Sequence, residues 1–151
     1  MVERTLVLVK PDGVKRRLIG KVINRFEEKG LKIVALKMLV LSRQKAEHHY
    51  AVHKGKPFYE PLVSFITSGP IVAMVLEGES AIDVTRKLMG PTFGFDAPPG
   101  TIRGDFSLSR QFNIVHGSDS QKTADYEIPI FFSKEEILSY QTEDEKFFKS
   151  D

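Results

Sequence analysis

The first clear apolar segment of the chain covers residues 4–9, with the sequence Arg-Thr-Leu-Val-Leu-Val. A short, nearly continuous run of apolar and β-branched residues is typical of a strand that is buried in a sheet. The run stops at Lys10, which is followed by a Pro-Asp-Gly sequence that favours a turn. We therefore predict a central strand over residues 4–9 and a turn directly after it.

Helical and strand-like patterns alternate in the next forty or so residues. Apolar residues recur at helical spacing over residues 18–29, and Gly30 stands where a helix commonly ends. Residues 31–41 are rich in β-branched side chains, which favours a strand. Ser42, a good N-cap residue, then begins a second helical segment that includes Tyr50.

The same alternation continues through the middle of the chain. We predict a short helix after Pro57, a strand over residues 71–76 and a helix from Ser80 to Met89. The Ser80–Asp83 spacing resembles a capping box, in which each side chain would bond the other residue's backbone.

Residues 91–111 interrupt this pattern with three prolines, three glycines and no long periodic run. A loop of this length inside a compact domain is more often functional than not. A last strand over residues 112–115 leads to His116 and a final helix, whose start we place at a Ser118–Gln121 capping box. The order is βαββαβ with additions, which predicts an antiparallel sheet with helices on one face.

Length and composition point to one ordinary domain without disulfides. The chain has 151 residues, 41% of them hydrophobic and 28% charged, and it contains no cysteine. Disulfides and thiolate chemistry are therefore excluded, and the four histidines become the first candidates for catalysis. We treat residues 1–151 as a single domain, with a charged extension over 142–151 in which Phe147 and Phe148 are candidates to dock on a neighbour.

Location and partners follow from what the sequence lacks. No apolar run reaches the length of a membrane span, and the first residues do not resemble a signal peptide, so we expect a cytoplasmic protein without membrane contact. The net charge of +2 is spread over the whole chain. Nucleic acid is therefore a poor candidate for the main partner, because it calls for a concentrated basic face.

His116 lies between an apolar strand and a helix start, in the sequence Asn113-Ile-Val-His-Gly-Ser-Asp119. Free backbone N–H groups and the positive end of a helix dipole would attract an anion there. The alternative interpretation is a structural histidine at the end of a strand.

Three cationic side chains could help to bind an anion beside His116. Arg103 stands between two glycines of the long loop and could bond phosphate oxygens with its fork-shaped guanidinium, or it could simply pair with Asp105. Lys10 follows the first strand and could simply belong to the turn that begins there. Arg86 could simply lie on the polar face of its predicted helix. No Walker loop and no dinucleotide-binding turn is present, so a nucleotide would be held by dispersed cations and magnesium.

His49 and His53 are four residues apart, a spacing that can present two metal ligands on one helical face. No third ligand at an obvious spacing accompanies them. A solvated helix face is the alternative interpretation of this pair.

Four separated motifs together resemble those of the nucleoside diphosphate kinase family along nearly the whole chain. They are the segment around His116 and the segments 10–13, 68–70 and 99–105. The resemblance implies a ferredoxin-like α+β fold with a four-stranded antiparallel sheet covered by helices and a long active-site loop. It also implies Mg²⁺ and a homohexamer, or less often a tetramer. The implied reaction moves the γ-phosphoryl group of a nucleoside triphosphate, typically ATP, to a nucleoside diphosphate through a phosphohistidine, with little base specificity.

The resemblance also implies roles for particular residues. His116 would be phosphorylated, and Ser118 and Glu127 would orient its imidazole. Asp119 belongs to the matching segment, but we assign it a structural role at the helix start. Contacts with the nucleotide would come from Lys10, Tyr50, Phe58, Leu62, Arg86, Thr92, Arg103 and Asn113. Phe58 and Leu62 would lie against the base, and Lys10 would also act in catalysis. No residue is assigned as a direct metal ligand, because the phosphates would carry the magnesium.

Some positions depart from the family pattern, namely Gln111, Phe112 and Gly94. Strand alternation raises a further problem, because it would put Asn113 on the face opposite His116. The backbone must bend between them if both contact one nucleotide. Two other functions remain open: an RNA-binding domain of the same topology, although its aromatic strand motif is absent, and a phosphohistidine that serves a protein acceptor.

Overall fold

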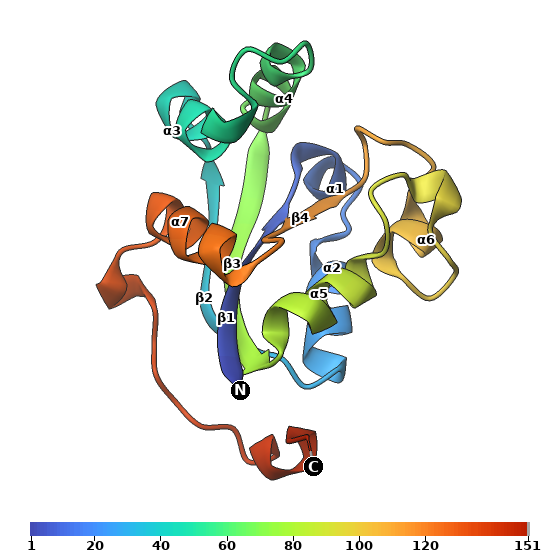
Figure 1. Cartoon of the computed structure of the whole chain (residues 1–151). Coiled ribbons are helices and arrows are strands. Elements are labelled where there is room, and N and C mark those ends of the chain that lie inside the picture. The colour runs from blue at the N-terminus through green and yellow to red at the C-terminus, as the bar shows by residue number, and fades with distance from the viewer. Residues whose placement is uncertain (151) are drawn as a thin grey trace.

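The computed structural model describes residues 1–150 and places a four-stranded antiparallel sheet at the centre of the molecule (Figure 1). The strands lie in the order β2-β3-β1-β4. Their bounds are Val2–Val9 for β1, Lys32–Val40 for β2, Pro70–Glu79 for β3 and Val115–Gly117 for β4. This is the ferredoxin-like α+β fold, and the prediction of a four-stranded antiparallel sheet with helices is confirmed.

Seven α-helices and four short 3₁₀ segments surround the sheet in the part of the chain that the structure describes. The α-helices are α1 (Pro11–Lys15), α2 (Ile19–Glu28), α3 (Arg43–His49), α4 (Tyr59–Ile66), α5 (Ala81–Met89), α6 (Ile102–Phe106) and α7 (Gln121–Phe131). The 3₁₀ segments are η1 (Ala51–His53), η2 (Gly94–Asp96), η3 (Lys134–Glu136) and η4 (Glu145–Phe148).

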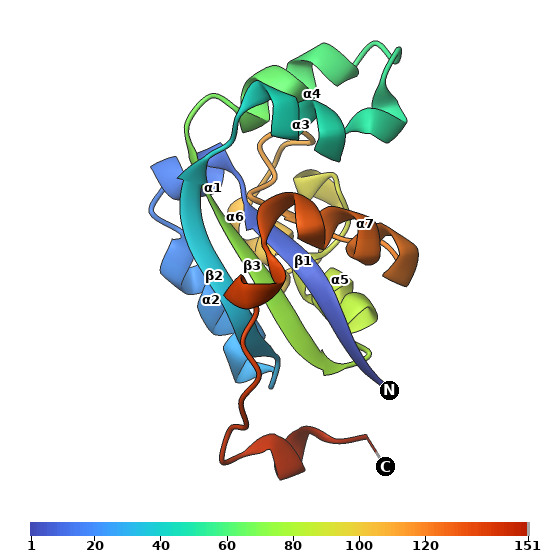
Figure 2. The same cartoon turned by 90° about the vertical axis from the view of Figure 1, so that its left-hand side faces the viewer.

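Helices cover both faces of the sheet, so the expectation of helices on one face was wrong. Alternate residues of β1 belong to two separate cores: Leu6 and Leu8 pack with α7, and Val7 and Val9 pack with α2. Figure 2 shows α7 in front of the sheet and α2 behind it. The uninterrupted apolar run over residues 6–9 of β1 fits this arrangement, because a strand segment that is covered on both faces needs no polar side.

The long segment 91–111 is more ordered than its composition suggests. It contains η2 and the helix α6, whose N-cap Thr101 accepts a hydrogen bond from Gly104 N at 2.9 Å. Gly104 has to be a glycine here, because a Cβ would lie 1.9 Å from the Pro98 carbonyl oxygen. Arg25 on α2 donates to the Gly100 carbonyl oxygen at 2.9 Å, which attaches this segment to the body of the domain.

Two predicted capping boxes do not form. Ser80 precedes α5 with a left-handed backbone (φ 51°) and no side-chain cap; instead, the Glu3 carboxylate accepts from Ile82 N at 3.3 Å. The final helix is capped by Ser120, which accepts from Thr123 N at 3.1 Å, and not by Ser118. Ser118 is thereby free for another contact, described below.

The described part of the C-terminal extension, residues 142–150, lies below the sheet in Figure 1, next to the connection between α2 and β2. Lys32 forms an ion pair with Glu145 at 2.6 Å, and Phe148 packs directly over Gly30. Phe147 is 73% exposed, so only Phe148 of the two candidate docking residues is held by the same chain.

Candidate active site

A large cavity of about 1460 Å³ opens between α3, α4, α5, the segment 91–111 and the β4–α7 connection. His116, the middle residue of β4, lines it and is 25% exposed. The strand is therefore shifted from the predicted residues 112–115: it begins only at Val115, and it contains His116 and Gly117. His116 pairs with Leu8 of the buried strand β1, so its backbone is fixed at the β4 edge of the sheet.

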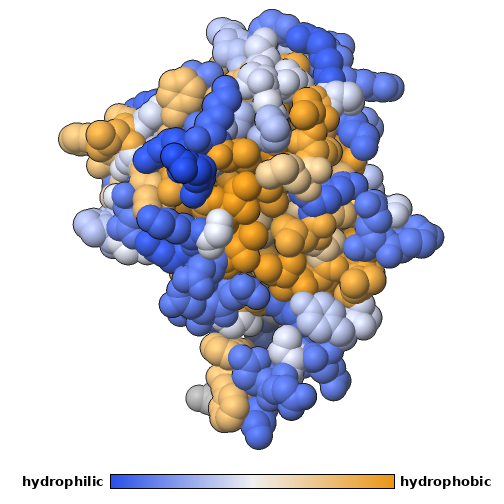
Figure 3. Space-filling view, turned by 180° about the vertical axis from the view of Figure 1, so that it is seen from behind, coloured by the Kyte–Doolittle hydropathy of each residue, from blue (hydrophilic) through white to orange (hydrophobic). Residues whose placement is uncertain are grey.

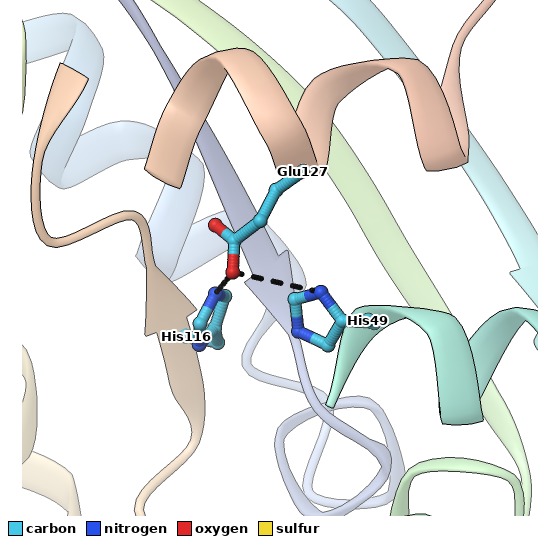
Figure 4. A group of neighbouring side chains, drawn as sticks. All are labelled: His49, His116 and Glu127. Carbon is cyan, nitrogen blue, oxygen red and sulfur yellow. Dashed lines mark hydrogen bonds and ion pairs between the residues drawn. The ribbon is translucent and has the colours of Figure 1, made fainter. Parts of the chain in front are cut away.

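A carboxylate fixes one edge of the His116 ring. Glu127 Oε2 on α7 lies 3.0 Å from His116 Nε2, and Ser118 Oγ donates to the other carboxylate oxygen, Oε1, at 2.7 Å (Figure 4). Burial by itself would raise the pKa of the Glu127 carboxyl. The hydrogen bond and charge of His116, together with the bond from Ser118, outweigh this and lower the pKa, so the carboxylate stays ionised at neutral pH.

His49, the last residue of α3, approaches the same carboxylate from the other side. Its Nδ1 lies 3.6 Å from Glu127 Oε2, and its ring meets that of His116 edge-on at 4.8 Å between centroids. The side chain is fully buried, and neither ring nitrogen has a hydrogen-bond partner among the described residues. Burial lowers the pKa of His49 to about 3, with the His116 charge adding to the effect, so this ring is neutral at pH 7.

Two buried cations, Lys10 and Arg103, form another part of the cavity wall. Lys10 Nζ donates to Asn113 Oδ1 at 2.6 Å and to the Gln111 carbonyl oxygen at 2.9 Å. Arg103 donates to the carbonyl oxygens of Gly90 at 2.8 Å and Val115 at 2.7 Å. Within residues 1–150 neither cation forms an ion pair with a carboxylate, so this wall keeps unbalanced positive charge.

Burial also changes the acid–base behaviour of these cations. It lowers the pKa of Lys10 to about 8; the Asp12 charge opposes this, and the Arg103 charge adds to it. It lowers the pKa of Arg103 to about 10, with the Arg86 charge acting in the same direction. The interpretation of Arg103 as a partner of Asp105 was wrong, because Asp105 bonds Arg25 instead, at 2.5 Å.

The bend that the sequence required lies at Ile114. This residue has a φ of 75°, a left-handed conformation that is unusual for a β-branched side chain. Its N–H donates to Asp12 Oδ2 at 3.0 Å, and its carbonyl oxygen accepts from Lys10 N at 2.8 Å. The reversal breaks strand alternation, so Asn113 and His116 both line the cavity.

Nearly all the residues that the sequence nominated meet in this cavity. Its lining contains His116, Glu127, Lys10, Tyr50, Phe58, Leu62, Arg86, Thr92, Arg103 and Asn113. Ser118 lies behind it, buried against Glu127. Asp119 directly precedes the helix cap Ser120 and lies exposed at the cavity.

The two histidines His49 and His53 do not form the pair that their spacing suggested. His49 ends α3 and is buried beside His116, whereas His53 belongs to η1 and stacks edge-on against Phe58. Both earlier interpretations of His49, a ligand paired with His53 and a solvated helix face, were therefore wrong. Nothing in the local sequence indicates its contact with Glu127, because 78 positions separate the two residues.

Taken together, the fold and the site define a phosphotransferase: a fixed, partly exposed imidazole and uncompensated buried cations line one cavity that is large enough for a nucleotide. Comparison with known proteins specifies the class further. The family model described as Nucleoside diphosphate kinase matches residues 3–137. The chain belongs to the nucleoside diphosphate kinase family, the enzymes that transfer the γ-phosphoryl group of a nucleoside triphosphate to a nucleoside diphosphate.

Individual relatives agree with this assignment. The nucleoside diphosphate kinase of Staphylothermus marinus is 62% identical over 138 residues, 91% of this chain and 98% of that protein. The enzyme of Thermoplasma acidophilum is 59% identical over 145 residues, 96% of this chain and 98% of that protein.

Solved structures show the same fold. A Halobacterium salinarum nucleoside diphosphate kinase in complex with CDP superposes with a TM-score of 0.96 at 45% identity, covering 99% of this chain and 100% of the other. A transition-state mimic of the Borrelia burgdorferi enzyme with bound vanadate and ADP gives 0.92 at 41% identity, covering 98% of each chain. In residues 1–150 no helix has the length and apolar character needed to span a bilayer.

Proposed function

We propose that this enzyme works by a ping-pong mechanism in which Nδ1 of His116 is the nucleophile. The observation that carries this proposal is the contact between His116 Nε2 and Glu127 Oε2 at 3.0 Å. A neutral imidazole has one N–H and one lone pair. If Nε2 carries the proton that Glu127 accepts, the lone pair is on Nδ1, on the other side of the ring from Glu127 (Figure 4).

The first half-reaction follows from this tautomer. Nδ1 attacks the γ-phosphorus of the triphosphate, the bond from that phosphorus to the β,γ-bridging oxygen breaks, and the diphosphate leaves with the bond electrons. The ring becomes cationic as the N–P bond forms, and the ionised Glu127 stabilises this charge. In the second half-reaction a terminal oxygen of another diphosphate attacks the same phosphorus, and Nδ1 leaves with its lone pair.

The cation wall would hold the phosphates during both steps. Lys10 and Arg103 are buried without a carboxylate partner among the described residues, and Arg86 is exposed at the same cavity. Positive groups that are fixed before the substrate arrives stabilise the equatorial oxygens of a loose transition state. Asn113, Thr92 and Tyr50 line the cavity near these cations and would contact the phosphates or the sugar.

Phe58 and Leu62 lie at the α4 side of the cavity and would contact the base. Phe58 is 46% exposed and presents a ring without hydrogen-bonding groups. Stacking and apolar contact tolerate every base because each has a flat π-face. We therefore propose that the enzyme discriminates little among bases.

Mg²⁺ fits this site as an ion carried by the phosphates. The carboxylates that line the cavity are Asp119 and Glu127, and Glu127 already bonds His116 and Ser118. Magnesium is usually bound by one or two carboxylates together with substrate phosphates. Asp119 would be the side chain that supports it, and the ion would neutralise charge on the β- and γ-oxygens.

We propose further that the chain forms a homo-oligomer, either a hexamer or a tetramer. Leu36, Met38 and Val40 of β2 are 51%, 59% and 64% exposed and alternate along one face of this edge strand. Figure 3 shows a broad apolar area on the back of the molecule, the side on which β2 and α2 lie. An area of this kind marks a protein interface. Sedimentation velocity would test the oligomeric state. The cytoplasmic location of the protein stays a prediction.

Labelling with γ-labelled ATP tests the nucleophile. Incubation of the wild-type protein should yield an acid-labile phosphoprotein, and added GDP should then remove the label as labelled GTP. His116→Ala should take up no label and lose activity by roughly 10⁴-fold or more. His48→Ala, which removes an exposed histidine outside the cavity lining, is the matched control and should label normally. Acid-labile label in His116→Ala would contradict the proposal.

A further inference from the structure

His49, His116 and Glu127 form a cluster that the transfer reaction does not fully explain. One potential donor atom from each residue lies within 4.8 Å of the other two. Glu127 Oε2 is 3.0 Å from His116 Nε2 and 3.6 Å from His49 Nδ1 (Figure 4). The proposed mechanism uses the contact between Glu127 and His116, but it gives His49 no role.

His49 is an unusual residue to bury without partners. Its side chain has no exposed surface, yet neither ring nitrogen is hydrogen-bonded within the described chain. Buried polar groups are satisfied in most proteins, because a donor or acceptor that loses water without replacement costs free energy. A neutral imidazole of this kind keeps a lone pair available for a metal ion.

From this geometry we infer that His49, His116 and Glu127 form an inhibitory binding site for Zn²⁺. Two imidazoles and one carboxylate are a common ligand set for zinc with an open fourth position. Tetrahedral zinc with bonds of about 2.0–2.1 Å spaces its donor atoms about 3.3 Å apart. The two separations from Glu127 lie on either side of that value. The donor nitrogens of His49 and His116 lie within 4.8 Å of each other, so the two rings must turn toward each other to bind the ion.

The surroundings favour such a site. Ser118 holds the second oxygen of Glu127, which fixes the carboxylate as outer contacts do around known metal ligands. Phe131 and Tyr50 pack against the His49 ring, so one side of the cluster is dry. The other side opens through the partly exposed His116 to the cavity, which provides an entry path. Zinc is favoured over Mg²⁺, because Mg²⁺ prefers oxygen donors.

Zinc at this position would block catalysis through the tautomer of His116. Coordination uses the lone pair of Nε2, so the neutral ring must carry its proton on Nδ1. Nδ1 then has no lone pair to attack phosphorus, and Glu127 is occupied by the metal. Zinc should therefore lower the rate of His116 phosphorylation without competing for the nucleotide. This kinetic consequence rests on the proposed function, whereas zinc binding does not.

Calorimetric titration of the full-length protein with Zn²⁺, in the absence of nucleotide, tests the binding. We expect one ion per chain in the wild type. His49→Phe keeps an aromatic ring and removes both nitrogens, and His49→Ala is a second variant in case the larger ring disturbs folding. Either should weaken zinc binding by about tenfold or more, whereas His48→Ala, the exposed neighbour, should not. Binding in both His49 variants as tight as in the wild type would overturn the inference.

Two further measurements keep binding and function apart. Co²⁺ bound to the wild type should give the intense visible absorption of a tetrahedral site, and a weak octahedral spectrum would count against the site. Zinc should slow labelling by ATP in excess Mg²⁺, and each His49 variant should need about tenfold more zinc for the same fractional slowing. Equal sensitivity of wild type and variants would overturn the inhibition. Wild-type protein that binds zinc but never labels would contradict the proposed function alone.

Discussion

The two walls of the cavity treat charge in opposite ways. On the His116 wall, an ionised carboxylate is bonded by a hydroxyl and an imidazole, so the charge is satisfied inside the protein. On the cation wall, Lys10 and Arg103 donate to carbonyl and amide oxygens, which do not cancel their charge. The wall with balanced charge orients the nucleophile. The cation wall keeps positive charge that can bind phosphate. The following experiments test this division, beginning with the largest expected effect.

Glu127→Gln should disrupt the orienting wall most severely. A glutamine that donates to His116 Nε2 would favour the tautomer with the proton on Nδ1, and it would no longer stabilise the cationic ring. We expect the labelling rate to fall roughly 10³-fold with little change in nucleotide affinity. Single-turnover labelling and an independent nucleotide titration would measure the two quantities. A large loss of affinity with a normal labelling rate would show that Glu127 belongs functionally to the other wall.

Lys10→Met should damage the cation wall. The loss of one fixed positive group opposite the phosphates should reduce kcat/KM about 10²-fold, and binding of the nucleotide should suffer as well. Lys15→Met, at the exposed end of α1, is the matched control and should keep wild-type kinetics. Equal effects of the two substitutions would mean that general charge, and not the buried position, matters.

Asp12→Ala should destabilise the backbone reversal at Ile114, which places Asn113 at the cavity. Asp12 accepts from the N–H of Ile114, the residue whose left-handed backbone brings Asn113 to the cavity. Leaving that N–H buried without a partner should lower the free energy of unfolding by about 2 kcal/mol, about thirtyfold in the folding equilibrium. Asp83→Ala, on the exposed face of α5, should change stability by less than about 0.5 kcal/mol. Urea unfolding of both variants provides the comparison.

The pH profile should reveal the burial of Lys10. Its pKa is lowered to about 8, so the active cation is present below pH 8 and is lost as the pH rises through that value. We expect kcat/KM, which reports free-enzyme ionisation, to fall about tenfold between pH 7 and pH 9 from this group alone. Lys10→Arg should retain its charge and remove this limb. A profile that is flat to pH 9 in the wild type would contradict the assignment.

Much of the fold could be predicted from the sequence, because the spacing of apolar residues within a short segment is enough to identify a helix or a strand. The helix 18–29, the strand 31–41 and the cap at Ser42 were placed within a residue or two of their observed positions. The errors occur where a contact distant in sequence decides the outcome. Ser80 and Ser118 had good capping spacing, but the Glu3 and Glu127 carboxylates determine the bonding at those places.

For the site, the sequence by itself determined the chemical groups: a histidine in a recognisable segment, a lysine after the first strand and an arginine between glycines. The tertiary structure decided how they act. Burial, which no residue type reveals alone, lowers the pKa of Lys10 and of His49. The reversal at Ile114 and the meeting of α3 with α7 bring together groups from distant segments. Charge and hydrogen bonding depend on distance through space, and only the folded chain sets that distance.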